Sequence, residues 1–140
     1  MKTYDLPELL KLCSLIKGEE HAQQWLIDHG YRELSEFWDA YENVEKSFKW
    51  LLDHDHRELA ALVDGLQGDD NAKFFLIKSG HRELAALIDA AEGNKTAVLW
   101  LMKFNQKPWL AVAREIYMYN KKNQQKGFWK IFNFGNPFRG

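Results

Sequence analysis

A 25-residue internal repeat constrains this chain more than any other feature of its sequence. The segment YRELSEF begins at residue 31, and the segment HRELAAL begins at residues 56 and 81. The same spacing relates an aromatic residue and the leucine that follows it, at Trp25-Leu26, Trp50-Leu51, Phe75-Leu76 and Trp100-Leu101. A fixed period of this length predicts a structural unit that is repeated along the chain.

Each unit has the pattern of two short helices joined by a turn. In the unit 81–105, Leu84, Leu87 and Ile88 follow the i, i+3, i+4 spacing of one helical face, and a second apolar face begins after Gly93. Helices of about ten residues are marginal in isolation, so their apolar faces must be buried on neighbouring units. We therefore predict an all-α fold, a right-handed α/α superhelix of tandem 25-residue helix hairpins.

The second helix of each unit carries an additional apolar column, outside the face that packs on its hairpin partner. Stacking requires each unit to contact the next one as well, so this column is expected to form that contact. Its members are Ile27, Leu52, Ile77 and Met102.

The repeat also sets the domain boundaries. We predict a helical-repeat domain over 1–125 and a basic, aromatic C-terminal tail over 126–140. In the last unit Trp109 and Val112 take the positions of the two leucine columns. The units are 6–30, 31–55, 56–80, 81–105 and a divergent closing unit, 106–125.

The period, and the motif H-R-E-L-A-A-L-x-D with W-L eleven to twelve residues after the Asp, resemble those of α/α superhelical repeat proteins. This class includes HEAT, armadillo and tetratricopeptide arrays, and the helix pair also resembles that of ankyrin repeats. The resemblance covers about residues 6–120. It is one of architecture, because those repeats have about 33 to 47 residues. It implies a rigid, curved scaffold that presents a surface to partners.

Two outward-facing apolar residues are the first candidates for partner binding. The helical wheel of the second helix points Lys49, Phe74 and Leu99 toward solvent in successive units. Large apolar side chains exposed on adjacent units form the kind of patch that marks an interface. The alternative is that the C-terminal tail or a second copy of the chain covers Phe74 and Leu99.

The C-terminal region is the second candidate, because charge is unevenly distributed along the chain. Residues 1–102 have 11 Lys and Arg against 19 Asp and Glu, a net charge of −8, whereas residues 103–140 have 8 against Glu115 alone, a net charge of +7. The tail either caps the last repeat, binds a partner protein, or lies on an anionic membrane or nucleic acid. Its candidate side chains are Lys126, Trp129, Lys130, Phe132 and Phe134.

Two charged columns predict a structural ladder between units. Arginine is unfavourable at a helix start and aspartate has poor propensity inside a helix, yet both recur in three units. We expect bidentate Arg–Asp pairs between adjacent units, ending where the aspartate column becomes Arg114. The members are Arg32, Arg57 and Arg82 with Asp39, Asp64 and Asp89.

The segment Asp53-His54-Asp55-His56 offers zinc-type ligands. However, His54 and His56 occupy repeat columns at a helix junction, where a ring can pack and donate a hydrogen bond. The sequence leaves open whether Asp53, His54 and His56 bind a metal.

Other signals favour a binding protein of the cytoplasm. Cys13 has no internal disulfide partner, and neither a signal peptide nor a membrane span is expected. No phosphate loop or catalytic motif is present, so we expect no catalytic residue, cofactor or small-molecule substrate. We expect a non-enzymatic protein–protein interaction module. The alternative is an adaptor whose tail binds an anionic membrane surface or nucleic acid, and the oligomeric state is left open.

Overall fold

The computed structural model describes the backbone of residues 2–134 and the side chains of residues 2–124. Over this range the protein is all-α, with nine helices and no strand, which confirms the predicted class. The helices are α1 (Leu6–Ile16), α2 (Glu20–Asp28), α3 (Arg32–Tyr41), α4 (Glu45–Asp53), α5 (Arg57–Leu66), α6 (Asp70–Lys78), α7 (Arg82–Ala91), α8 (Lys95–Lys103) and α9 (Lys107–Phe134).

The helix boundaries follow the 25-residue period. Each of the first four units supplies one odd-numbered helix and one even-numbered helix, and α9 is the first helix of the closing unit. Where glycine is replaced at a junction, Asn43, Asp55 and Asn105 take its place with φ of 70°, 63° and 58°. These residues tolerate the left-handed conformation better than other side chains, which is why the period survives without glycine.

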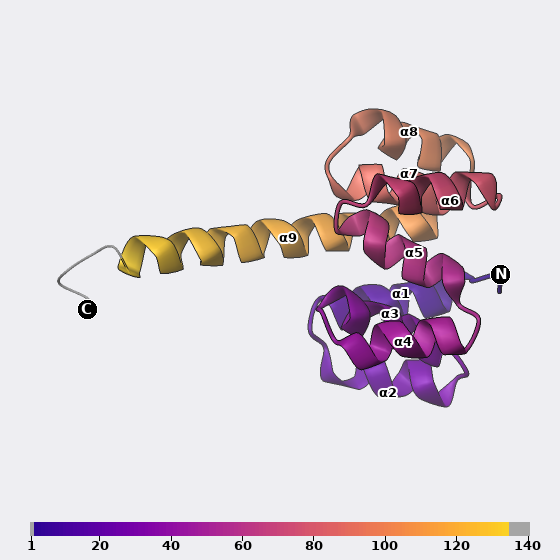
Figure 1. Ribbon diagram of the computed structural model, residues 1–140, viewed down its shortest axis with the longest axis horizontal. Coiled ribbons are helices and arrows are strands. Elements are labelled where there is room, and N and C mark those ends of the chain that lie inside the picture. The colour runs from indigo at the N-terminus through magenta and orange to yellow at the C-terminus, as the bar shows by residue number, and fades with distance from the viewer. Residues whose placement is uncertain (1, 135–140) are drawn as a thin grey trace.

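The odd-numbered helices form an inner layer. They pack in chain order, α1 on α3, α3 on α5, α5 on α7 and α7 on α9 (Figure 1). Each even-numbered helix packs outside them, on its own hairpin partner and on the next odd-numbered helix. The backbones of the even-numbered helices lie too far apart for these helices to pack directly on one another. We call the two sets the inner helices and the outer helices.

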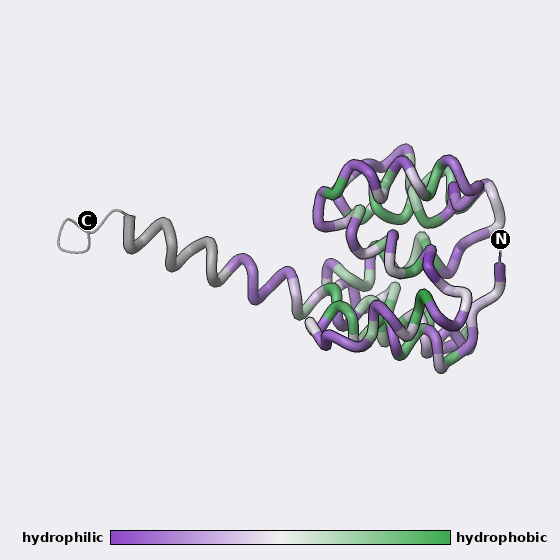
Figure 2. The backbone as a smooth tube through the Cα atoms, turned by 90° about the horizontal axis from the view of Figure 1, so that it is seen from below, coloured by the Kyte–Doolittle hydropathy of each residue, from purple (hydrophilic) through white to green (hydrophobic). Residues whose placement is uncertain are grey.

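The repeat columns supply the core. Apolar and polar stretches alternate along the helices, as the periodic sequence requires (Figure 2). Burying each leucine or phenylalanine stabilises the fold by about 1.5–3 kcal/mol, so the core is spread evenly over the units. The largest of the fully buried side chains are those of Leu9, Leu12, Leu26, Leu34, Phe37, Leu51, Leu59, Leu62, Leu76, Leu84, Leu87 and Leu101.

The first and last helices meet, because α9 packs on α1 as well as on α7. The ring of Tyr4 meets that of Trp109 edge-on, with centroids 5.9 Å apart, and Lys17 Nζ lies 3.5 Å from Glu115 Oε2. Farther along α9, the Tyr41 hydroxyl donates a hydrogen bond of 2.8 Å to Asn120 Oδ1. An open row of stacked units would keep α1 and α9 apart, so the inner helices instead form a closed set of five.

Small residues let the inner helices approach one another closely. Ala40, Gly65 and Ala90 occupy one column of the inner helices, and all three are buried. A Cβ added at Gly65 would collide with Ile88 Cδ1 of the next inner helix. The inner helices therefore approach closely while the larger outer faces spread apart.

Helix α9 has 28 residues, against nine to eleven in the others. At 1.5 Å per residue it is about 42 Å long, and Figure 1 shows it leaving the bundle. It therefore continues past the expected boundary at residue 125. The tail candidates Lys126, Trp129, Lys130, Phe132 and Phe134 are on this part of α9, and their side chains lie outside the described residues. None of the described helices is both long and apolar enough to cross a membrane.

Candidate partner-binding surfaces

The outer helices expose the apolar column that was expected to join adjacent units. Ile27, Leu52, Ile77 and Met102 are between 40% and 49% exposed. The expected contact is therefore formed only in part. Each outer helix packs on the next inner helix, and Ile77 lines a groove with Ala85 and Ala86 of the next unit, but all four side chains stay largely open to solvent.

Phe74 and Leu99 are the most exposed large apolar side chains of the described residues, at 62% and 65%. They lie on α6 and α8, two successive outer helices. Lys49 occupies the same column on α4 and is also exposed, with its Nζ 4.0 Å from Asp53 Oδ2. The exposure of all three agrees with the helical wheel, and their part in binding stays a prediction.

A groove of about 350 Å³ lies between α6 and α8. Because the two helices do not pack directly on one another, the small side chains of Ala85 and Ala86 on α7 line it, together with Ile77 and Trp100. We call this groove, with Phe74 and Leu99 on the helices that form it, the α6–α8 face.

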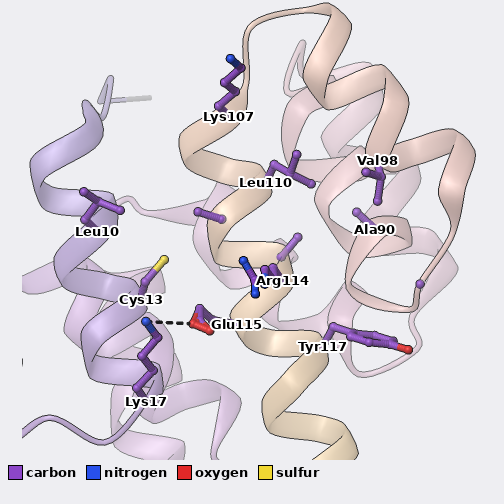
Figure 3. A pocket seen from close by; sticks show the side chains of 13 residues that line it. Leu10, Cys13, Lys17, Ala90, Val98, Lys107, Leu110, Arg114, Glu115 and Tyr117 are labelled. Atoms are coloured by element: carbon purple, nitrogen blue, oxygen red, sulfur yellow. Dashed lines mark ion pairs between the residues drawn. The ribbon is translucent and has the colours of Figure 1, made fainter.

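A larger groove, of about 860 Å³, follows α9 (Figure 3). Leu110, Ala111 and Arg114 of α9 line its middle. Leu10 and Cys13 of α1, with Lys17 just past its end, form one side, and Ala90 of α7 and Val98 of α8 form the other. Gly93, in the turn between α7 and α8, also lines the groove. We call it the α9 groove.

The α9 groove is basic, although residues 1–102, which form the rest of the bundle, have a net charge of −8. Lys17, Lys107 and Arg114 line it, and Glu115 is the one carboxylate among its lining residues. That carboxylate is already paired with Lys17. Burial, helped by the charge of Glu115, raises the pKa of Cys13 to about 11, so this side chain is a thiol at neutral pH and a poor nucleophile.

Sequence reasoning did not find the α9 groove. Two signals for it were present: the closing unit lacks the aromatic-leucine pair of a second short helix, and the aspartate column changes sign at Arg114. Neither signal reveals a groove by itself, because the other side is supplied by α1, from the far end of the repeat.

Comparison with known proteins gives no match: no family model, no curated protein and no solved structure matches the chain. The functional interpretation therefore depends on the surfaces that the fold leaves open. Two of them are hollowed and lined by apolar side chains, the α6–α8 face and the α9 groove, and the second also carries basic side chains.

The predicted Arg–Asp ladder is not formed by the described side chains. Arg32 Nε lies 3.4 Å from Glu36 Oε1 in its own helix, and Arg57 Nε lies 3.8 Å from Asp55 Oδ1. The ladder required an arginine at a helix start to meet an aspartate seven residues along the neighbouring helix. The inner helices repeat in register, so these positions are about 10 Å apart along the axis.

The three aspartates of the ladder have other surroundings. Asp89 pairs with Lys73 of the preceding outer helix, at 2.9 Å. Burial raises the pKa of both Asp39 and Asp64, and neighbouring carboxylates add to each shift. Arg82, the remaining arginine, lines the groove between α6 and α8.

The histidines pack at helix ends. His29 stacks on Trp25 with centroids 3.9 Å apart, and His54 stacks on Trp50 at 4.0 Å. Each Nδ1 lies within 2.9 Å of the carbonyl oxygen of that tryptophan. His56 also stacks on Trp50, at 5.7 Å. Among residues 2–124, no three His, Cys, Asp or Glu side chains are arranged to hold a metal ion.

Proposed function

We propose that the protein is a non-enzymatic protein–protein interaction module that binds a protein or peptide partner on its α6–α8 face. The observation that carries this proposal is the exposure of Phe74 and Leu99, at 62% and 65%, on the two helices that form a groove. Burying a side chain of this size is worth about 1.5–3 kcal/mol. A partner that covered both would therefore gain a substantial part of its binding energy from them.

The scaffold that we propose is a short, right-handed α/α superhelix. The 25-residue period and the packing of each inner helix on the next support it. The superhelix would be so tightly wound that its first and last units meet. Such a scaffold holds the outer helices rigidly, which lowers the entropic cost of binding.

The surroundings of the reactive side chains support a non-enzymatic role. The Cys13 thiol has a raised pKa, and both His29 and His54 are stacked and near a carbonyl oxygen. The α6–α8 face offers apolar side chains, with Lys73 already paired to Asp89. These features suit a surface that is covered by a partner.

An affinity capture from the native host tests the proposal. Intact protein is compared with the Phe74→Glu/Leu99→Glu variant, and a His21→Glu/Gln24→Glu variant serves as the control, because it places the same two charges at exposed positions of another outer helix, α2. Wild type and control should retain the same partner, and the first variant should lose it. Circular dichroism verifies that each variant is folded, and titration calorimetry with the purified partner measures the affinity. Equal affinity for all three proteins would refute the proposal.

A second candidate function rests on α9. This helix leaves the bundle, and Lys121 and Lys122 on it are exposed within a region of net charge +7. The region would then bind an anionic membrane surface or nucleic acid, with the bundle as a spacer. Vesicles with anionic lipids and short oligonucleotides test this. Binding should weaken steeply with salt and disappear when the chain is truncated at Gly127.

A further inference from the structure

The two layers of the fold have different numbers of helices. Five inner helices are accompanied by only four outer helices in the part of the chain that the structure describes. Each of α3, α5 and α7 contacts two outer helices, its own hairpin partner and the preceding one. By contrast, α9 contacts only one outer helix, α8, and α1 contacts only one, α2. One outer position, between α8 and α2, is therefore vacant.

The α9 groove lies at this vacant position. A fifth outer helix would pack on α9 as its hairpin partner and on α1 as the next inner helix. Side chains of α9 and α1 line most of the groove, and Ala90 of α7 and Val98 of α8 form its opposite edge (Figure 3). The volume of about 860 Å³ thus corresponds to an absent structural element of the repeat.

The four resident outer helices indicate what the position accepts. Each has nine residues and buries a small residue and a leucine four positions later, with an aromatic residue directly before the leucine. An amphipathic helix of this length, with the pattern small-x-x-aromatic-leucine, matches the shape of the position.

The basic side chains of the groove favour a helix that carries acidic side chains. Arg114 stands in the column that is aspartate in the three preceding units, where Asp89 binds Lys73 of an outer helix. Lys107 and Arg114 are both exposed and line the groove, and the one carboxylate there is already paired. A helix that carries carboxylates therefore complements this groove better than one that carries lysines.

We propose that the α9 groove binds an acidic amphipathic helix of a partner protein, which takes the place of the missing fifth outer helix. The proposal shares with the proposed function the idea that the partner is a protein. It concerns a different surface, so each can fail without the other.

The chain supplies its own probe. Residues 19–30, EEHAQQWLIDHG, form an outer helix that carries three acidic residues and no Lys or Arg. A fluorescent peptide with this sequence, stapled so that helix formation is not limiting, is titrated with the full-length protein. The matched control peptide has Glu19→Lys, Glu20→Lys and Asp28→Lys and is otherwise identical. The acidic peptide should bind saturably, and the control peptide should bind at least about tenfold more weakly, because charge-assisted contacts are lost.

Protein variants locate the binding site. Arg114→Glu should weaken binding of the acidic peptide by about tenfold or more. Lys78→Glu, an equally exposed change at the end of α6, should leave it unaltered. Amide chemical-shift changes on adding the peptide should concentrate at Leu110, Ala111 and Val98.

Several results would overturn the proposal. These are the absence of saturable binding, equal binding of both peptides, or an Arg114→Glu variant that binds like wild type. Peptide binding that competes with self-association, measured by analytical ultracentrifugation, would assign the groove to a second copy of the chain instead. The Phe74→Glu/Leu99→Glu variant should bind the peptide normally, which separates this test from that of the α6–α8 face.

Discussion

Lys73 Nζ donates a hydrogen bond of 2.9 Å to Asp89 Oδ1, and this contact joins the outer helix α6 to the following inner helix α7. The repeat places Phe48 opposite Asp64 at the preceding junction and Val98 opposite Arg114 at the following one. Phe48 and Asp64 line the same shallow hollow. The aspartate column therefore belongs to the junction between an outer helix and the next inner helix, and only one of its members has a lysine opposite.

The Lys73–Asp89 pair should make a modest, measurable contribution to stability. Both side chains are about one-third exposed, so we expect a coupling of about 0.5–1 kcal/mol in a double-mutant cycle of Lys73→Ala and Asp89→Ala. The hydrogen bond to Asp89 raises the pKa of Lys73 in the folded protein. The contribution is therefore fully present at pH 7 and up to about pH 10, and it is lost as the pH rises through the folded pKa. Urea unfolding at pH 7 and at high pH tests this, and a coupling that grows with pH would contradict it.

The ionised carboxylate of Asp64 should destabilise the fold, whereas that of Asp89 stabilises it. Burial, and then the charge of Asp69, raise its pKa, so ionising it opposes folding. Its place in the last turn of α5 adds an unfavourable interaction with the helix dipole. Asp64→Asn should raise the free energy of unfolding by about 0.5 kcal/mol at pH 7, a value that allows for solvent screening.

The stability gained in Asp64→Asn should depend on pH. A raised folded pKa means that the cost of ionisation is present at pH 7 and vanishes in acid, below the unfolded pKa of about 3.9. The gain from Asp64→Asn should therefore be absent at pH 3. The matched variant Asp89→Asn should lose stability at pH 7, since it breaks a pair with Lys73. Urea titrations followed by circular dichroism compare the two, and equal effects would show that pairing is irrelevant in this column.

The sequence was sufficient for the local features of the fold. The period identifies Leu59 and Leu84 as core residues, and both are fully buried. It also assigns Asn43 to a left-handed junction, where the residue has a φ of 70°. These features depend on spacing within one unit, which a single sequence contains.

Closure of the inner helices, and hence the α9 groove, could not be read from the period. Contacts such as Tyr4 with Trp109 join residues from opposite ends of the repeat. They depend on the sum of small rotations between units, which side-chain size sets only indirectly. The ladder failed for a related reason, because Arg57 and Asp64 were assigned to partners without regard to register along the axis.

Gly65 should be intolerant of even one added carbon. Alanine favours a helix over glycine by about 1 kcal/mol, so Gly65→Ala would stabilise an exposed helix. Here the new Cβ would collide with Ile88 Cδ1, and Ile88 is too well enclosed to move away freely. We expect a net loss of about 1–3 kcal/mol.

A second substitution tests whether this collision is the cause. Ile88→Val removes Cδ1 and should recover part of the loss in the Gly65→Ala background, although it costs about 0.5–1.5 kcal/mol by itself. Thermal and urea unfolding of the single and double variants give the comparison. Strictly additive losses would exclude the close approach of α5 and α7 as the reason.

The reactivity of the Cys13 thiol measures how well the α9 groove is closed on the side of α1. Its side chain is 5% exposed, and its pKa is raised to about 11, first by burial and then by the charge of Glu115. At pH 8 the thiolate fraction is then smaller than that of an ordinary cysteine by a factor of about 100 or more, since the unperturbed pKa is about 8.5. Reaction with a disulfide reagent should be slower in the folded protein by at least this factor.

In Glu115→Gln the Lys17 charge remains while the opposing carboxylate is gone, so the pKa of Cys13 should fall and the reaction should accelerate. Arg57→Gln, far from this thiol, should leave the rate unchanged, and a wild-type rate equal to that of the unfolded chain would mean that α1 and α9 do not enclose Cys13.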